Sequence, residues 1–336
     1  MAGFNRLMRW SRLVHSVVWS SLTLGCVGGW AHPSAVAAHE GQHVDSTEAA
    51  GQDSPLGASR ARRERVGDRW LITGDGLPGH ARAAFPNRSN PNAIREQSVR
   101  FMVPATPTAA ADFTPLQFPG KFGVAINGVA FDPQAAEWWQ RNPRSGWSYE
   151  PLAPGTRFLG LDESHAHVQP DGTYHYHGIP TALVEQIAAE QALEALAAPA
   201  GTAPERAVDD LVLVGWAADG FPLYAASPGS PSPKSSYRVK TGSRPGGPGG
   251  SYDGTFTEDW EYVPGLGDLD QANGRTAATP EHPDGTYHYV LTDTFPFVPR
   301  FFRGQPDESF RGGRGPRGEP GGRAGPRPSF RPPPRR

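Results

Sequence analysis

The chain has almost no cysteine: among its 336 residues there is one, Cys26. A disulfide needs two cysteines, and thiolate metal sites usually use several, so neither is expected here. The sequence also lacks a G-x-S-x-G nucleophile elbow and a G-x-x-x-x-G-K-[ST] phosphate loop. Serine-hydrolase chemistry of that type and P-loop nucleotide hydrolysis are therefore not indicated. Any metal ion must be held by histidine or carboxylate side chains.

Long hydrophobic runs are absent apart from one near the N-terminus. Arg6, Arg9 and Arg12 precede the apolar run "LVHSVVWSSLTLGCVGGWA", and small residues follow it up to Ala38. A basic start, an apolar middle and a small-residue cleavage region are typical of a secretory signal peptide, which we predict for residues 1–38. The expected location is therefore outside the cytoplasm: periplasmic, extracellular or at the cell surface.

Two alternatives stay open for this leader. The apolar run could be a single membrane anchor, although His15 and several Ser and Gly residues interrupt it. The string "LTLGC" also resembles a lipoprotein signal in which Cys26 would carry a lipid, although Thr23 stands where such signals prefer Leu. No further transmembrane stretch follows, so the mature chain is expected to have no transmembrane domain.

Basic residues are concentrated at the two ends of the chain. The tail from Arg311 contains eight Arg and one Glu, and the leader contains three Arg and no acid. Since the whole chain carries a charge of −2, residues 39–310 carry −12. An acidic body argues against a specific nucleic-acid partner and is compatible with cation binding.

Glycine and proline are abundant, with 41 and 36 residues, and this excludes long helices throughout. Short strands joined by turns predict a mainly β fold, either a β-sandwich or a barrel-like domain, with one inserted helix at 181–198. Thr181 can cap this helix, and Val184 and Ile187 begin its apolar stripe. The predicted parts of the chain are a disordered linker at 39–65, a β-rich domain at 66–304 with a Pro/Gly/Ser-rich insertion at 227–254, and a disordered tail at 305–336.

Two parts of the predicted domain contain related strings in the same order. The first has "INGVAF" at 126–131, "LGLDES" at 159–164 and "PDGTYHY" at 170–176. The second has "ADGFPLY" at 218–224, "LGDLDQ" at 266–271 and "PDGTYHY" at 283–289. This repetition predicts two related β units, at about 121–180 and 211–304, packed into one domain.

The string "HAHVQPDGTYHYHG" at 165–178 combines a turn with four histidines. Pro170 and Asp171 suit the centre of a type I turn, and Gly172 can supply the left-handed residue that follows. The resulting hairpin pairs Gln169 with Thr173, His167 with His175, and His165 with His177. Because side chains alternate along a strand, the four imidazoles would share one face, and the two tyrosines between them would point to the other.

Four imidazoles on one face favour a transition-metal site, with copper or zinc as the expected ion. The predicted ligands are His165, His167, His175 and His177. Neighbouring imidazoles would lie about 5–7 Å apart, which is within reach of one ion. A hydrogen-bonded histidine network and a histidine/tyrosine surface for other ligands stay open as alternatives. A one-residue slip of the register would separate the two histidine pairs.

Other residues could support this site. His80 and His288 are possible additional ligands, and Asp162 and Asp219 could orient ligand imidazoles. The same hairpin geometry, applied to the second copy, pairs Pro280 with His288 and puts Val290 in the place of His177. The second copy is therefore expected to be a scaffold without the full ligand set.

These strings resemble the YHYH-domain family, named after the tetrapeptide found here at 174–177. The resemblance rests on "GVAINGVAFDPQAAEWW", "HAHVQPDGTYHYHGIP", "GWAADGFPLY" and "PDGTYHYVLTDTFPFVPRFFRG". It implies export, a β-rich fold and a common role for the four histidines. This chain departs from the family pattern in two places: the second motif ends YHYV, and "LDQANGR" ends in Arg275 without a cysteine. A ligand or disulfide from that stretch is therefore in doubt.

The leading hypothesis is an exported protein that binds a transition metal through its histidine hairpin. Four bound histidines would close the site, whereas three would leave a position for water. An enzymatic reaction, oxidative or hydrolytic, is open at this stage, as are the substrate and the oligomeric state. The alternative is a cell-surface module that binds a carbohydrate or a protein partner without metal.

Overall fold

The computed structural model describes residues 59–153, 159–197 and 210–312. The predicted signal peptide with Cys26, most of the predicted linker and most of the predicted tail lie outside these residues. Within them the protein is mainly β with one α-helix, so the predicted fold class is confirmed.

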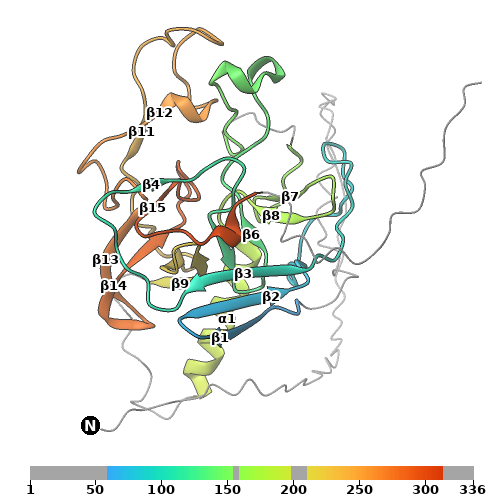
Figure 1. The fold of residues 1–336 in the computed structure, drawn as a ribbon, viewed down its shortest axis with the longest axis vertical. Helices are drawn as coiled ribbons and strands as arrows, with labels where there is room; N and C mark the ends of the chain where they lie inside the picture. The colour runs from blue at the N-terminus through green and yellow to red at the C-terminus, as the bar shows by residue number, and fades with distance from the viewer. Residues whose placement is uncertain (1–58, 154–158, 198–209, 313–336) are drawn as a thin grey trace, which may run out of the picture. The chain divides into compact units, whose positions relative to one another are not determined.

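The largest element is an eight-stranded mixed sheet with the order β13–β14–β10–β9–β5–β6–β8–β7. The hairpins at its two edges, β13–β14 and β7–β8, are labelled at the left and at the right of Figure 1. The strands are β5 Gly123–Ala125, β6 Ala130–Phe131, β7 Ala166–Val168, β8 Tyr174–Tyr176, β9 Leu211–Ala217, β10 Pro222–Ala226, β13 Gly274–Thr279 and β14 His282–Val290. The pairs β6–β8 and β10–β14 are parallel. The other neighbours are antiparallel.

The strand order of this sheet is the same from its centre toward either edge. On one side of the central β5–β9 pair, the hairpin β5–β6 lies next to β8 of the hairpin β7–β8. On the other side, the hairpin β9–β10 lies next to β14 of the hairpin β13–β14. Two related units that pair through their first strands would give this order. The duplication itself stays a prediction.

Three smaller sheets and the helix complete the described fold. One is an antiparallel sheet of β1 Arg62–Val66, β2 Arg69–Gly74 and β3 Val99–Pro104. The other two are the pair β11 Tyr237–Val239 with β12 Trp260–Tyr262 and the pair β4 Thr114–Pro115 with β15 Phe301–Phe302. The helix α1 is Thr181–Ala197, and the short 3₁₀ helices are η1 Trp139–Arg141, η2 Pro143–Ser145, η4 Thr257–Asp259 and η5 Glu308–Phe310.

One hydrophobic core joins the eight-stranded sheet, the β1–β3 sheet and α1. Ile72 of β2, Val214 of β9 and Ile187 of α1 belong to the same cluster of buried side chains. Tyr174 and Tyr176 of β8 are 1% and 0% exposed, as the alternation of the hairpin predicts. The predicted stripe of α1 is buried only in its first half: Val184 and Ile187 are buried, whereas Ala192 and Ala195, farther along the stripe, are exposed.

Secondary structure is also described on both sides of the predicted domain range, 66–304. Strand β1 begins at Arg62, inside the predicted linker, where Arg63 lies over the ring of Trp70 at 4.0 Å and stabilises the strand by a cation–π contact. At the other end, Phe310 is buried and stacks on Phe101 with ring centroids 4.4 Å apart. Tertiary contacts of a few aromatic rings therefore order segments whose composition indicates a linker or a tail.

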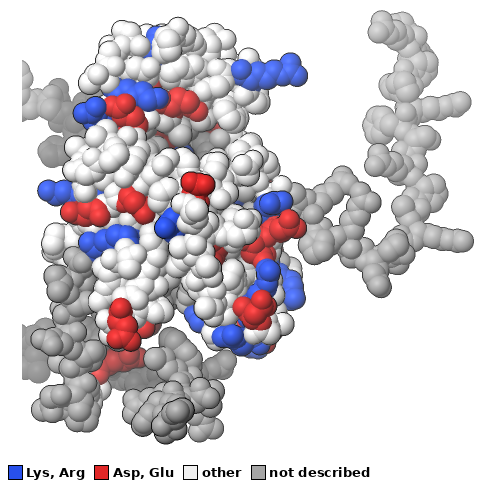
Figure 2. Space-filling model, turned by 60° about the vertical axis from the view of Figure 1, so that its left-hand side comes forward, with Lys and Arg blue, Asp and Glu red and all other residues white. Residues whose placement is uncertain are grey.

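Charged side chains of both signs are interspersed on the face of the molecule that Figure 2 shows. Exposed ion pairs include Arg60 with Glu96 at 2.6 Å and Arg238 with Glu261 at 2.9 Å. Solvent-exposed pairs of this kind stabilise a fold by about 0–1 kcal/mol, so the stability of the domain depends mainly on the core.

The tripeptide Pro-Asp-Gly has different positions in the two hairpins. In the first it forms the turn, since Gly172 donates its N–H to the carbonyl of Gln169. In the second the chain reverses between Thr279 and His282, and Pro-Asp-Gly lies within β14 next to an irregularity of the ladder. The predicted pairing of Pro280 with His288 is therefore wrong. His288 pairs instead with Arg275. The segment that joins these two residues is longer than the one that joins the paired histidines of the first hairpin.

We predict that Gly172→Ala destabilises the protein more than Gly285→Ala. Both glycines have a positive φ, 92° and 88°, which is costly for alanine. A Cβ on Gly172 would also lie 2.7 Å from Cβ of Arg95, whereas the nearest atom at Gly285 is 3.7 Å away. The expected losses are about 2–4 kcal/mol for Gly172→Ala and about 1–2 kcal/mol for the control, measured by urea denaturation. Equal losses would contradict the close approach of Arg95.

Candidate metal centre

The histidine hairpin adopts the register that its turn predicts. His167 of β7 pairs with His175 of β8, and the N–H of Gln169 donates to the carbonyl of Thr173 at 2.9 Å. The N–H of His177 donates to the carbonyl of His165 at 2.8 Å. Gly172 has the left-handed conformation that this turn requires. The local sequence therefore determines which side chains share a face.

Three of the four histidines lie together. The ring centroids of His167, His175 and His177 are 4.7, 4.8 and 4.7 Å apart, and each pair of ring planes meets at 70°. The three potential ligand atoms lie within 4.8 Å of one another, and the Nε2 atoms of His175 and His177 are 3.1 Å apart. We call these residues the histidine trio. Two nitrogens bound to one tetrahedral zinc at about 2.0–2.1 Å would be separated by about 3.3 Å, so the spacing fits shared coordination.

Main-chain carbonyls orient two of the three rings of the trio. Nδ1 of His167 lies 2.9 Å from the carbonyl oxygen of Leu159, and Nδ1 of His175 lies 3.4 Å from that of Thr173. A nitrogen that faces a carbonyl carries the proton, so Nε2 is left with its lone pair. This is the tautomer in which a histidine binds a metal through Nε2 while its other nitrogen is held by the protein. The contact of His175 is long and orients its ring only weakly.

The electrostatic environment keeps the trio neutral. Burial lowers the pKa of His175 and of His177 well below the usual value, and the nearby charge of Lys121 lowers both further. Burial also lowers the pKa of His167, although its contact with Leu159 opposes this effect. Lys121 forms an ion pair with Asp132 beside the trio. Neutral imidazoles are the form that coordinates a metal ion.

His165 lies outside the trio. It precedes β7 and has a φ of 54°, because the carbonyl of Asp162 accepts its N–H in a tight turn. Its Nδ1 lies 2.8 Å from the carbonyl oxygen of Ile179. Strand alternation does not apply to a residue in a turn, so the imidazole of His165, the expected fourth ligand, faces the carbonyl of Ile179 and not the trio.

The two possible additional ligands are not part of the trio either. His80 packs on the tyrosine face of the hairpin, where its Nε2 is 2.6 Å from the hydroxyl of Tyr176. His288 is on β14, in the other half of the sheet, and its ring is 5.4 Å from that of Tyr224. Neither position allows a contact with the ion that the trio could hold.

The two aspartates predicted as supporting residues hold backbone and tyrosine groups instead of imidazoles. Asp162 accepts hydrogen bonds from the hydroxyl of Tyr174 and from the N–H groups of Ser164 and Ala166. Asp219 accepts hydrogen bonds from the hydroxyl of Tyr289 and from main-chain N–H groups, one of them that of Gly304. Asp162 thereby fixes the start of β7, which carries His167, whereas Asp219 belongs to the second half of the sheet.

Three features of the site are not predicted from the sequence. The neighbours Lys121 and Asp132 lie before and after the β5–β6 hairpin, and only the parallel pairing of β6 with β8 brings them to the trio. No side chain in the sequence indicates that the carbonyl of Leu159 contacts the ring of His167. In the second half, the ladder places Arg275 where the first has His167, since Arg275 pairs with His288 as His167 pairs with His175. The second copy therefore lacks the trio for two reasons: Arg275 and Val290.

The fold and the trio together define a mainly β protein with a candidate three-histidine metal centre on a hairpin. The sequence model of the family described as YHYH protein matches residues 100–304, which is more than half of the chain. The chain therefore belongs to the YHYH protein family. No curated protein and no solved structure matches it. Within residues 59–153, 159–197 and 210–312, no helix is long and apolar enough to cross a membrane.

We predict that Asp219→Asn reduces the pH dependence of stability between about pH 4 and pH 6. Burial raises the pKa of Asp219 to about 6, so the native state binds its proton more tightly than the unfolded state does. This contribution is complete below about pH 4 and is lost as the pH rises through 6. The free energy of unfolding of the wild type, relative to the variant, should fall by up to about 3 kcal/mol over this range, measured by urea denaturation. Parallel pH profiles would contradict the raised pKa.

Proposed function

We propose that this protein is exported and binds one transition-metal ion, copper or zinc, through His167, His175 and His177. One observation carries the proposal: three imidazoles have nearly equal separations and the same mutual angle of 70°. Three ligands leave one position of a tetrahedral ion for water, and zinc in such a site lowers the pKa of that water to about 7. The pair of Lys121 and Asp132 lies close enough to influence this position electrostatically.

A histidine network without metal explains less of the geometry. In a direct hydrogen bond, one of the two Nε2 atoms that lie 3.1 Å apart would have to carry a proton. The contact of Nδ1 in His167 with Leu159 requires Nε2 of that ring to be an acceptor, and it too faces the other two rings. The Nδ1 contacts leave the Nε2 atoms of His167 and His175 as acceptors, and a cation between the rings would satisfy both. The metal hypothesis supplies the cation.

Elemental analysis of the full-length protein, reconstituted with copper and with zinc and then dialysed, tests this proposal. We expect close to one equivalent of one of these metals and a midpoint of thermal unfolding that falls when a chelator removes it. Bound ligand at about 100 times its Kd stabilises a fold by about 2.7 kcal/mol, so the shift is measurable. The double variant His167→Ala/His175→Ala should lose both the metal and the shift.

Two single variants are the controls of this experiment. His282→Ala removes an exposed histidine of β14 and should keep the full metal content. His165→Ala should also keep it if three histidines bind the ion, and should lower it if four do. Absence of stoichiometric metal from the wild type, with a thermal midpoint that chelator does not change, would refute the metal proposal.

The export proposal rests on the leader and predicts where the mature chain begins. Cleavage after Ala37 or Ala38 would leave Ala38 or His39 as the first residue. Mass spectrometry of the chain recovered from outside the cytoplasm of its native host should find one of these N-termini. A chain that begins at a lipidated Cys26 would establish the lipoprotein alternative, and an uncleaved chain confined to the cytoplasm would contradict export.

A further inference from the structure

A cavity of about 450 Å³ lies in the half of the fold that contains β11 and β12. None of the trio lines it, and its volume is within the range of about 300–1,000 Å³ that is typical of small-molecule sites. Its lining is rich in aromatic side chains, among them Phe118, Trp138, Tyr237, Trp260, Tyr262 and Phe295. These residues come from segments that are far apart in the sequence. We call this cavity the aromatic pocket.

The aromatic rings offer flat surfaces that are only partly covered. Trp138, Trp260 and Tyr262 are half-buried, and Phe118 is 48% exposed. Trp260 stacks on Phe295 with ring planes 3° apart and centroids separated by 4.7 Å. Its indole N–H donates to the carbonyl of Gly254 at 3.3 Å, so the ring plane is fixed from two sides. Partly exposed rings of this kind favour a ligand with an apolar face.

The charged groups of the aromatic pocket already have partners. Arg300 pairs with the buried Glu150 at 2.7 Å. Both carboxylate oxygens of Glu258 accept hydrogen bonds from Ser148, one from its N–H at 2.8 Å and one from its hydroxyl at 3.0 Å. A charged ligand would therefore have to displace an existing partner, and this costs the free energy of that pair.

Neutral polar groups complete the lining. The side chains of Gln134, Thr257 and Gln271 are half-buried and carry both donors and acceptors. A wholly apolar ligand would make no hydrogen bond to the amides of Gln134 and Gln271, and covering polar groups without a partner is unfavourable. The complementary ligand has apolar faces and a neutral polar edge.

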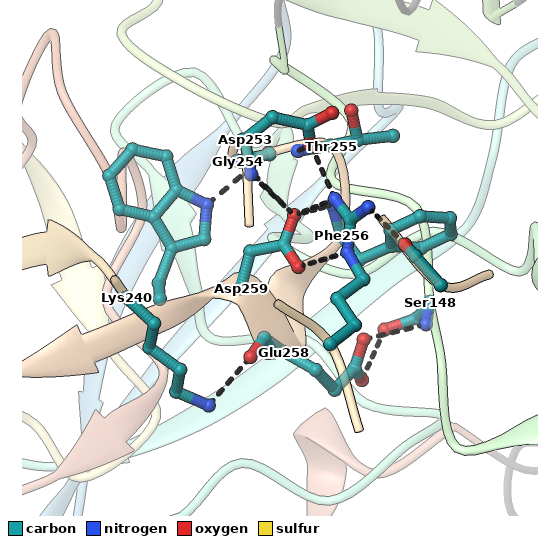
Figure 3. A network of polar contacts seen from close by, with 11 residues as sticks. Ser148, Lys240, Asp253, Gly254, Thr255, Phe256, Glu258 and Asp259 are labelled. Atoms are coloured by element: carbon teal, nitrogen blue, oxygen red, sulfur yellow. Dashed lines mark hydrogen bonds and ion pairs between the residues drawn. The ribbon is translucent and has the colours of Figure 1, made fainter. Parts of the chain in front are cut away.

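A buried network holds one wall of the aromatic pocket in place (Figure 3). Asp259 is fully buried and accepts hydrogen bonds from the side chain of Arg244 at 2.8 and 2.6 Å and from the N–H of Gly254 at 3.0 Å. Nζ of Lys240 donates to the carbonyl of Glu258 at 2.7 Å. These contacts fix the segment that carries Glu258 and leads into Trp260. A wall that is ordered before binding reduces the entropy that binding costs.

We propose that the aromatic pocket binds a neutral saccharide. The C–H face of a sugar ring is apolar and flat enough to stack on an indole or a phenyl ring, and its hydroxyl groups donate and accept hydrogen bonds without carrying charge. These properties match the half-exposed rings, the neutral amides and hydroxyls, and the paired charges of the lining. This inference goes beyond the proposed metal binding and does not depend on it.

Isothermal titration calorimetry of the full-length protein with cellotetraose, maltotetraose and the tetramer of N-acetylglucosamine tests this inference. At least one tetrasaccharide should bind with a Kd of about 1 mM or tighter. Trp138→Ala should weaken that binding at least about tenfold, since a fully packed aromatic contact is worth more than a factor of ten. Trp139→Ala is the matched control, because it changes the same residue type at the next position, which does not line the pocket. It should leave the Kd within about twofold.

Two further measurements separate saccharide binding from misfolding and from metal binding. Phe118→Ala changes an exposed residue, so it should fold normally and still weaken saccharide binding if Trp138→Ala fails to fold. Chelator-treated protein should bind the saccharide as the untreated wild type does, which separates this result from the metal experiment. The inference is overturned if no tetrasaccharide binds, if Trp138→Ala and Trp139→Ala have equal effects, or if phenol binds in the pocket and the saccharides do not.

Discussion

The hydrogen bond between the hydroxyl of Tyr174 and the carboxylate of Asp162, 2.6 Å long, is the interaction on which the histidine site depends. It anchors the tyrosine side of β8 in the core. The same carboxylate accepts the N–H of Ala166 and so fixes the first residue of β7. Once one face of a two-stranded hairpin is buried, alternation determines what the other face presents. The convergence of His167, His175 and His177 follows from this constraint and from the Pro-Asp-Gly turn.

The second half of the sheet has the same anchor without the same site. Tyr287 donates its hydroxyl hydrogen bond to Asp270, and the N–H of Gly274 donates to the same carboxylate. Asn273 has a φ of 54°, the value that His165 has in the first half. The backbone frame of the hairpin is therefore independent of the histidines that it carries. In this protein the frame supports the fold in both halves, and the histidine trio is an addition to one of them.

Whether a feature of this fold can be predicted from the sequence depends on the range of the interactions that determine it. The register of the first hairpin was predictable because a short turn signal determines it locally. The orientation of His165 was not, because it depends on a turn closed by Asp162 that alternation cannot reveal. The second hairpin was misread because an identical tripeptide lies in a strand there, and the longer connection to Arg275 moves the turn. The contribution of Lys121 depends on strand pairing across the sheet, and no local pattern indicates it.

The spacing of the trio along the chain has a consequence for how the site assembles. All three imidazoles come from eleven consecutive residues, 167–177, joined by one tight turn. Closing so short a loop costs little chain entropy, so the ligands can meet as soon as this hairpin forms. The aromatic pocket, in contrast, combines segments from 116 to 301 and exists only when nearly the whole domain has folded. A metal ion could therefore be captured by an early, local element of the chain, whereas a ligand of the pocket can bind only the finished fold.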